Sequence, residues 1–389
     1  MRRLHLIAIE VDHEPAHRVV EPIGPRISAR KQRCNLNKTD LADSLRPGTS
    51  TLRPHSADAG AGDEQAVARL QQARIQLKAE IAKAVVGQDE VIESLLIALL
   101  CRGHALMIGV PGLGKTLMAR TLARSLNMEY RRIQFTPDLL PSDITGTDII
   151  MEDPETGRRR LEFLRGPLFA NFLLADEINR APPKTQAALL QAMQELEVTV
   201  GRHTYPLAPP FFVVATQNPV EQEGTYPLPE AQLDRFMANI PVTYPTGAEE
   251  AQIVKSTTTN VVPTLEPILA AEEVLRLQAL VRGVPVANDV VDYAVALAAA
   301  SRPPSGPKSL EDVHHFIRYG ASPRASQYLV LGAKARALLN GRFHVDFADV
   351  TAMAIPVMRH RLVLNFHARA DGVDADEIIR RLQKHVRHK

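Results

Sequence analysis

The octapeptide GVPGLGKT, Gly109–Thr116, constrains this chain more than any other segment. It matches the pattern G-x-x-x-x-G-K-[ST] at every fixed position and lies between a short apolar run and a segment of helical periodicity. Glycines let a backbone wrap a phosphate closely, in conformations that a Cβ forbids, so that N–H groups point inward. The pattern therefore predicts a strand, a phosphate-binding loop and a helix, in that order. The alternative is a tight strand-to-helix turn that contains Gly and Lys by chance.

Short apolar runs alternate with amphipathic helical segments through residues 65–246, which is typical of a parallel α/β sheet. One such helical segment, Leu117–Leu126, places Met118, Leu122 and Leu126 on one face, as packing on a sheet requires. The expected strands are His104–Ile108, Tyr130–Phe135, Phe172–Ala175, Phe211–Thr216 and Met237–Val242.

The chain changes character on either side of this α/β region. Residues 247–389 lose the strand pattern, and we expect an all-helical domain there. Residues 1–64 mix Pro, Arg, Ser, Thr and Asp without a period, which predicts a disordered extension or, alternatively, a docking tail. The expected helices of the second domain are Glu249–Ser256, Ala271–Val281, Val290–Ala300, Gln327–Leu339 and Glu377–Val386.

Composition and charge argue against several classes of partner. The 46 basic and 44 acidic residues leave a formal charge of +2, so no global field attracts nucleic acid or membrane. The basic C-terminus suits the end of a helix, and we expect no nucleic-acid partner. We also expect no membrane span, and Glu10 and Asp12 interrupt an N-terminal stretch that imitates a signal peptide. Cys34 and Cys101 lack metal-ligand spacing and favour a reduced, cytoplasmic setting.

The phosphate-loop pattern assigns roles to particular side chains. Lys115 is expected to reach the β and γ phosphates of ATP, and the Thr116 hydroxyl is expected to ligate Mg²⁺. The helix that follows adds positive potential at its N-terminus. The residues predicted to bind the nucleotide here are Gly109, Val110, Pro111, Gly112, Leu113, Gly114, Lys115, Thr116 and Leu117.

Polar side chains end two further expected strands. The run NFLLADE delivers Asp176 and Glu177 at a carboxyl end, where ligands bind in open α/β sheets. We expect Asp176 to hold Mg²⁺ directly or through water, and Glu177 to polarise the attacking water. Alone, this pattern more often marks a strand that ends in a solvated turn. Asn218, in FFVVATQNP, could orient the same water or contact the γ phosphate, or form a turn before Pro219.

Three segments carry a resemblance to a known family. LLADEINRAPPKTQAALLQAMQE, ATQNP and YPLPEAQLDRF resemble the MoxR family of AAA+ ATPases, and the resemblance extends from about Val85 to the C-terminus. It implies an AAA+ phosphate-loop core of five parallel strands with a helical lid, assembled as a ring, expected to be a hexamer, with ATP and Mg²⁺ between subunits. It also implies hairpins at about Asp143–Leu168 and Val198–Leu207, with turns at Gly157 and Gly201.

The resemblance implies roles for further residues. Arg235, in QLDRF, matches the arginine finger that reaches a neighbouring subunit's γ phosphate; an ion pair with Asp234 is the alternative. Arg324 matches the lid arginine called sensor 2, which contacts phosphate, or it is a solvent-exposed arginine at a helix start. Gly87 and Gln88, in VVGQ, match a stretch that lies against adenine, or form a plain loop before a helix.

The work that the resemblance implies is chaperone-like remodelling or maturation of a client protein. That client could contain a von Willebrand factor A domain or be a metal-cofactor enzyme. One rival is a motor subunit of a metal-insertion complex similar to magnesium chelatase. The other is a nucleotide-dependent binding switch without useful turnover, which has no need of Glu177, Asn218 and Arg235 together.

Overall fold

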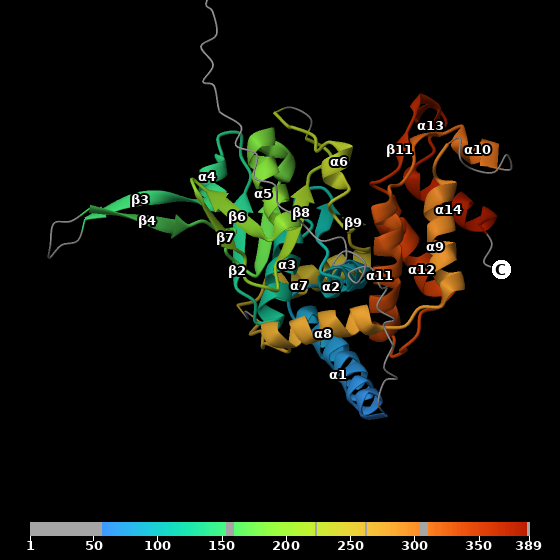
Figure 1. Ribbon diagram of the computed structural model, residues 1–389, viewed down its shortest axis with the longest axis horizontal. Helices are drawn as coiled ribbons and strands as arrows, with labels where there is room; N and C mark the ends of the chain where they lie inside the picture. Colours follow the sequence, from blue (N-terminus) through green and yellow to red (C-terminus); the bar gives the residue numbers. More distant parts are fainter. Residues whose placement is uncertain (1–56, 153–158, 222–223, 261–262, 304–309, 387–389) are drawn as a thin grey trace, which may run out of the picture. The chain divides into compact units, whose positions relative to one another are not determined.

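The computed structural model describes residues 57–152, 159–221, 224–260, 263–303 and 310–386. A five-stranded sheet lies at its centre, with strand order β2-β5-β8-β1-β9 and every neighbouring pair parallel (Figure 1). This confirms the predicted sheet, with strand ends shifted by at most one residue. The strands are β1 (Ala105–Ile108), β2 (Tyr130–Gln134), β5 (Phe172–Asp176), β8 (Phe212–Gln217) and β9 (Ala238–Pro241).

Successive residues of the central strands enter two different hydrophobic cores, one on each face of the sheet. Leu174 and Val214 join the core that includes α2 (Asp89–Leu100) and α3 (Lys115–Ser125). Leu173 and Val213 join the core that includes α5 (Pro183–Glu195). A strand buried on both faces must be apolar at consecutive positions, which explains the short apolar runs of the sequence.

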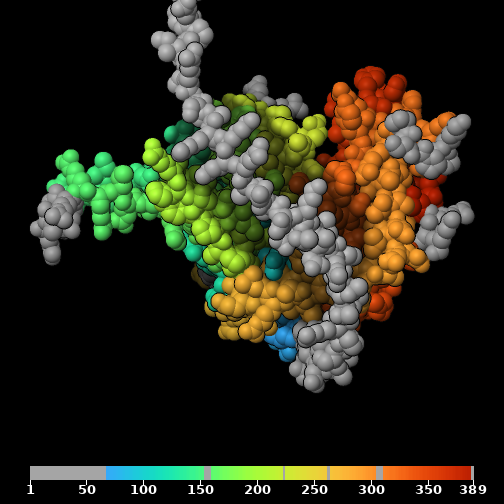
Figure 2. Space-filling view, viewed as in Figure 1, coloured from blue at the N-terminus to red at the C-terminus, as the bar shows by residue number. Residues whose placement is uncertain are grey.

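Two hairpins interrupt the α/β alternation where the resemblance implies them. β3 (Gly146–Glu152) pairs with β4 (Arg159–Arg165) before β5, and β6 (Glu197–Val200) pairs with β7 (His203–Pro206) before β8. Gly201 has a φ of 59° at the second turn, whereas Gly157 lies outside the described residues. Figures 1 and 2 show the β3–β4 hairpin projecting from the α/β part.

The helices after residue 246 divide between two environments. α7 (Gly247–Thr257) and α8 (Ala271–Gly283) lie with the α/β part, and Gln278 Nε2 on α8 donates to Leu99 O at 2.7 Å. The remaining helices form what we call the helical lid. These are α9 (Asn288–Ala300), α10 (Glu311–His314), α11 (Pro323–Leu339), α12 (Phe347–Met358), α13 (Phe366–Ala370) and α14 (Ala375–His385).

The prediction that this domain is all-helical is wrong in one detail. β10 (Ile317–Tyr319) and β11 (Val363–Leu364) form a small antiparallel sheet within the lid. Strands this short cannot show the alternation of apolar and polar residues by which a sequence predicts a strand.

Among the described residues no single helix is long and apolar enough to cross a membrane. Helices α8 and α9, bent by 96°, pass that test only as a pair, on length and composition.

The start of the folded chain also differs from the prediction. Residues 1–56, most of the predicted disordered extension, lie outside the described residues, and the boundary at residue 64 falls inside α1 (Ala57–Ala82). Leu70, Ala73, Leu77 and Ile81 are buried along one stripe of α1. Gly60 and Gly62 lie in its first turns, and the low helix propensity of glycine explains why the sequence pattern does not predict a helix there.

Arg74 ties α1 to two other elements. Its guanidinium donates to Glu93 on α2 at 2.7 Å and to Leu339 O at the end of α11 at 3.0 Å. We therefore expect removal of residues 1–82 to unfold the protein or sharply lower its Tm, because each buried leucine or isoleucine contributes about 1.5–3 kcal/mol. Removal of residues 1–56 is expected to leave the Tm unchanged. Thermal melts of both truncations test this, and an unchanged Tm without α1 would contradict it.

His104 is a buried histidine held in its neutral form. Its Nδ1 accepts a hydrogen bond from Val213 N at 3.0 Å, so its Nε2 carries the proton and donates to Met193 O at 3.2 Å. Burial lowers the pKa of His104 from 6.5 to about 4. Protonation would place an N–H against the Val213 N–H, which explains why the neutral form is favoured.

Acidification is expected to destabilise the protein through His104. Its folded-state pKa is lower than its unfolded-state pKa, so between pH 6.5 and about 4 the unfolded chain binds more protons. The contribution of His104 to the free energy of unfolding is complete above pH 6.5 and falls by about 1.4 kcal/mol per pH unit in that window. Unfolding of the wild type and of His104→Gln from pH 7.5 to 4.5 tests this, and parallel pH profiles would contradict it.

Candidate nucleotide-binding site

The phosphate loop joins β1 to α3, as the sequence predicts. Gly112 and Gly114 have φ values of 85° and 74°, which disfavour any residue with a Cβ even though a Cβ there would meet open space. Gly109 is required for a different reason, because a Cβ there would lie 2.6 Å from Val242 O. The loop therefore needs conformational freedom at its tip and close packing at its base.

Lys115 is the first residue of α3 and reaches back over the loop. Its Nζ donates to Gly109 O at 2.6 Å and to Val110 O at 2.8 Å. Burial lowers the pKa of Lys115, and the charges of Asp176 and Glu177 oppose that shift. The ammonium is thus held at the loop by carbonyl groups that a phosphate could replace as its partners.

Thr116 and Asp176 meet as the predicted metal ligands. Thr116 Oγ1 donates to Asp176 Oδ2 at 3.1 Å, and Thr216 Oγ1, from β8, donates to Asp176 Oδ1 at 2.6 Å. A hydroxyl and a carboxylate side by side suit Mg²⁺, which prefers oxygen ligands and usually keeps several waters and phosphate oxygens. The donor set therefore fits the predicted ion.

Arg132, which the sequence analysis missed, compensates the charge of Asp176. From β2 it donates to Asp176 Oδ2 through Nε at 3.0 Å and Nη2 at 2.7 Å. Its strand lies beside β5, with Gln134 opposite Asp176 in the register. Only the order of the strands, which is not visible in the sequence, brings this arginine to the acid.

Glu177 adopts a left-handed backbone conformation, with a φ of 56°, directly after β5. Gln134 Nε2 donates to its Oε2 at 2.7 Å, and Arg180 Nε lies 3.2 Å from the same oxygen. Its backbone N–H donates to Thr216 Oγ1 at 2.8 Å. The carboxylate is thus oriented by Gln134 and Arg180, neither of which the sequence analysis assigned to the site.

Asn218 serves the turn and also faces the site. Its Oδ1 accepts a hydrogen bond from Val220 N at 3.2 Å, as the turn-forming interpretation expects. The same side chain, almost fully buried, lines the cavity at the phosphate loop. The two interpretations are therefore compatible.

Lys115, Thr116, Asp176, Glu177 and Asn218, the residues predicted to act on phosphate, metal and water, line one cavity of about 420 Å³. We call it the phosphate cavity. It lies at the carboxyl ends of the central strands, where ligands bind in such sheets. The lining residues are Pro111, Gly112, Leu113, Gly114, Lys115, Thr116, Leu117, Arg132, Asp176, Glu177, Thr216 and Asn218.

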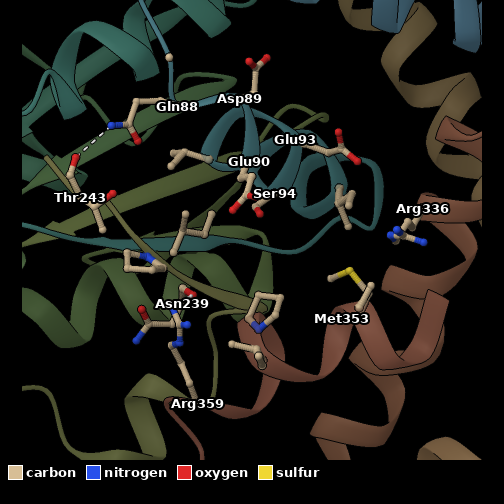
Figure 3. Close-up of a pocket in the computed structure, with 18 of the residues that line it drawn as sticks. Gln88, Asp89, Glu90, Glu93, Ser94, Asn239, Thr243, Arg336, Met353 and Arg359 are labelled. Atoms are coloured by element: carbon tan, nitrogen blue, oxygen red, sulfur yellow. Dashed lines mark hydrogen bonds between the residues drawn. The ribbon is translucent and has the colours of Figure 1, made fainter. Parts of the chain in front are cut away.

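The predicted adenine-contacting residues line a second cavity, of about 760 Å³, drawn in Figure 3. Gln88 Nε2 donates to Thr243 O at 3.0 Å, and Met353 and Arg359 face this region from the side of α12. Gly87 has a φ of 67°, which favours glycine, and a Cβ there would also displace the flexible carboxylate of Glu249. The contact of Gly87 and Gln88 with adenine stays a prediction.

Arg235 and Arg324 are outside the phosphate cavity of their own chain. Arg235 is half-buried after α6 (Glu230–Leu233), and its Nη1 donates to Leu190 O at 2.6 Å. Asp234 pairs instead with Arg361 at 2.7 Å and with Arg324 at 3.4 Å. The contacts of Arg235 and Arg324 with phosphate stay predictions.

Known proteins share this architecture. The sequence model of the ATPase family associated with various cellular activities (AAA) matches residues 104–238, and that of the AAA lid domain matches residues 310–382. A proposed ATPase from Cytophaga hutchinsonii has a crystal structure that superposes with a TM-score of 0.79 at 40% identity, over 86% of this chain and 100% of that one.

Curated relatives cover most of the chain. Chaperone MoxR1 of Mycobacterium tuberculosis is 45% identical over 79% of this chain and 80% of its own length. Protein MoxR of Paracoccus denitrificans is 37% identical over 74% of this chain and 88% of its own length. Fold and site therefore define an AAA+ ATPase with a lid domain. Within that class, the chain belongs to the MoxR family.

Proposed function

We propose that this protein binds ATP with Mg²⁺ in the phosphate cavity and hydrolyses it. The convergence of Lys115, Thr116, Asp176, Glu177 and Asn218 on one cavity carries this proposal. These residues come from three separate segments, which follow or end β1, β5 and β8. Together they supply an ammonium, a hydroxyl, two carboxylates and an amide, a combination that a purely structural turn does not require.

The residues divide the reaction between them. The loop N–H groups and Lys115 hold the phosphates, while Thr116 and Asp176 hold the metal, which neutralises phosphate charge when bound. Glu177, oriented by Gln134, accepts the proton of the attacking water, and Asn218 positions that water. Arg132 donates to Asp176 Oδ2, so a cation held by Asp176 would share this carboxylate with Arg132 or take the place of the arginine.

The position of Arg235 supports hydrolysis between subunits. It does not line the phosphate cavity of its own chain, so a finger at this residue serves a neighbouring copy in a ring, expected to be a hexamer. Arg324, near it in space, is the second arginine that we expect to act on phosphate. Nucleic acid is not an expected partner, and the cytoplasmic setting stays a prediction from composition.

The proposed work is remodelling or maturation of a client protein. The relative named a chaperone supports this proposal, and a client with a von Willebrand factor A domain stays the expectation. The projecting β3–β4 hairpin exposes Ile150, Leu161 and Leu164, which are suited to contacts with other polypeptides. A magnesium-chelatase-like motor and a nucleotide-dependent binding switch remain the rivals.

Replacement of Lys115 by alanine is expected to abolish ATP binding at micromolar nucleotide. Loss of a charged hydrogen-bond donor costs about 1.5–3 kcal/mol, or roughly 10- to 150-fold in affinity. Titration with a fluorescent ATP analogue measures this, and Lys184→Ala, which removes an exposed lysine on α5, is the matched control. Equal affinities for the wild type and Lys115→Ala would place the nucleotide elsewhere.

A further inference from the structure

Arg361 is a buried arginine that reaches from the lid into the α/β part. It follows α12, and its side chain is only 1% exposed. Its Nε donates to Asp234 Oδ1 at 2.7 Å, and its Nη2 donates to Asp234 O at 2.8 Å and to Phe236 O at 2.7 Å. Its Nη1 donates to Met237 O at 3.2 Å and to Val357 O. One guanidinium therefore holds the backbone on both sides of Arg235.

Other lid residues contact the same segment, residues 234–237. Ser322 Oγ donates to Asp234 Oδ1 at 2.9 Å, and Arg324 pairs with Asp234 Oδ2 at 3.4 Å. His360 Nε2 lies 3.0 Å from Phe236 O. We call Asp234–Met237 the finger segment, because it contains Arg235. The lid holds the Asp234 carboxylate and backbone carbonyl groups of this segment, whereas the N–H groups of the segment bond within the α/β part.

We call the contacts of Arg361 with the finger segment the clamp. These contacts are better suited to positioning the finger segment than to stabilising the fold. A buried ion pair has a high desolvation cost and is seldom more stabilising than apolar packing of similar volume. Burial lowers the pKa of Arg361, and the charge of Asp234 opposes that shift. The planar guanidinium donates hydrogen bonds in fixed directions to several acceptors at once, which the ammonium of a lysine cannot do. Such an arrangement specifies where the finger segment lies.

The clamp lies where the two parts of the chain meet. A hollow of about 460 Å³ opens between α6 and the β10–β11 sheet, and Glu230, Asp234, Arg318, His360 and Arg361 contribute to its lining. Figure 2 shows this hollow between the α6 region and the lid. Arg361 therefore lies both in the lining of this hollow and against the finger segment.

We infer that Arg361 is a positioning residue that sets the placement of Arg235, and so couples the lid of one subunit to ATP hydrolysis in the next. This inference rests on the proposed role of Arg235 as a finger. It predicts that loss of Arg361 damages only the finger of its own chain and leaves the phosphate cavity of that chain intact.

Trans-complementation tests the inference with full-length chains. Arg361→Lys keeps the charge and loses the fork, and we expect kcat to fall about 10²-fold, as for a misplaced catalytic group, with ATP affinity retained. Mixed with Lys115→Ala, which keeps its own finger but cannot use ATP, Arg361→Lys should regain activity as Arg235→Ala does. Adding Arg361→Lys to Arg235→Ala should lower kcat no further.

The controls separate this inference from the proposed function. Arg342→Lys alters an ion pair with Asp349 inside the lid and should leave kcat unchanged. Asp234→Asn serves as the second variant if Arg361→Lys fails to fold, with the same expected complementation. If Lys115→Ala rescues Arg235→Ala but neither Arg361→Lys nor Asp234→Asn, the inference is overturned and the finger stands. If Arg235→Ala itself is not rescued, the proposed finger fails and the inference fails with it.

Discussion

Replacing Arg235 by alanine is expected to lower kcat roughly 10³- to 10⁵-fold while ATP affinity stays near the wild-type value. A guanidinium brought to the transferring phosphoryl group neutralises charge that develops in the transition state, so its loss affects turnover more than binding. In its own chain Arg235 contacts Leu190 O and does not line the phosphate cavity, so ground-state binding there does not depend on it.

The same variant tests whether the finger acts between subunits. Arg235→Ala keeps an intact phosphate cavity, and Lys115→Ala keeps an intact finger, so rings that contain both should regain activity that neither has alone. Phosphate release from mixed samples, with mixed assembly shown by pull-down through a tag on one variant, measures this. No gain over the separate variants would leave Arg235 as a structural residue that donates to Leu190 O on α5.

Glu177→Gln is expected to retain ATP binding and to lose turnover by about 10²- to 10⁴-fold, because the amide cannot accept the proton of the attacking water. Gln134 orients the carboxylate at 2.7 Å, so the position of the side chain is already set. Nucleotide titration and phosphate release on the same sample separate the two properties.

Glu195→Gln is the matched control for this substitution. Its carboxylate lies exposed at the end of α5 and accepts from Gln191 at 2.7 Å, so kcat should not change. A Glu177→Gln protein that hydrolyses ATP at the wild-type rate would assign the base to another residue.

The sequence predicted the parts of the site that are local in the chain. The phosphate loop, Asp176 and Glu177 are recognisable because each follows or joins a strand of distinctive apolar composition. Arg132 and Gln134 were missed because their role depends on β2 lying beside β5, and a single sequence does not show strand order. Their neighbours in the chain give no sign of the contact.

Other misses have different physical causes. The boundary of the extension was predicted at residue 64, inside α1, because the glycine-rich beginning of this helix has low helix propensity and its buried stripe begins further along. α8 appeared to belong to the lid because periodicity identifies a helix and its buried face, but not the element against which that face packs. Arg361 was not predicted as a functional residue, because its buried contact with Asp234 joins distant parts of the chain and no local pattern indicates it.

Release of phosphate from ATP by the purified protein is the most direct test of ATP hydrolysis at the phosphate loop. We expect release that saturates with ATP, requires Mg²⁺, stops on addition of EDTA and is absent from Lys115→Ala prepared in parallel. Phosphate release by Lys115→Ala equal to that of the wild type, or no release by wild-type protein that binds ATP and has assembled, would contradict it.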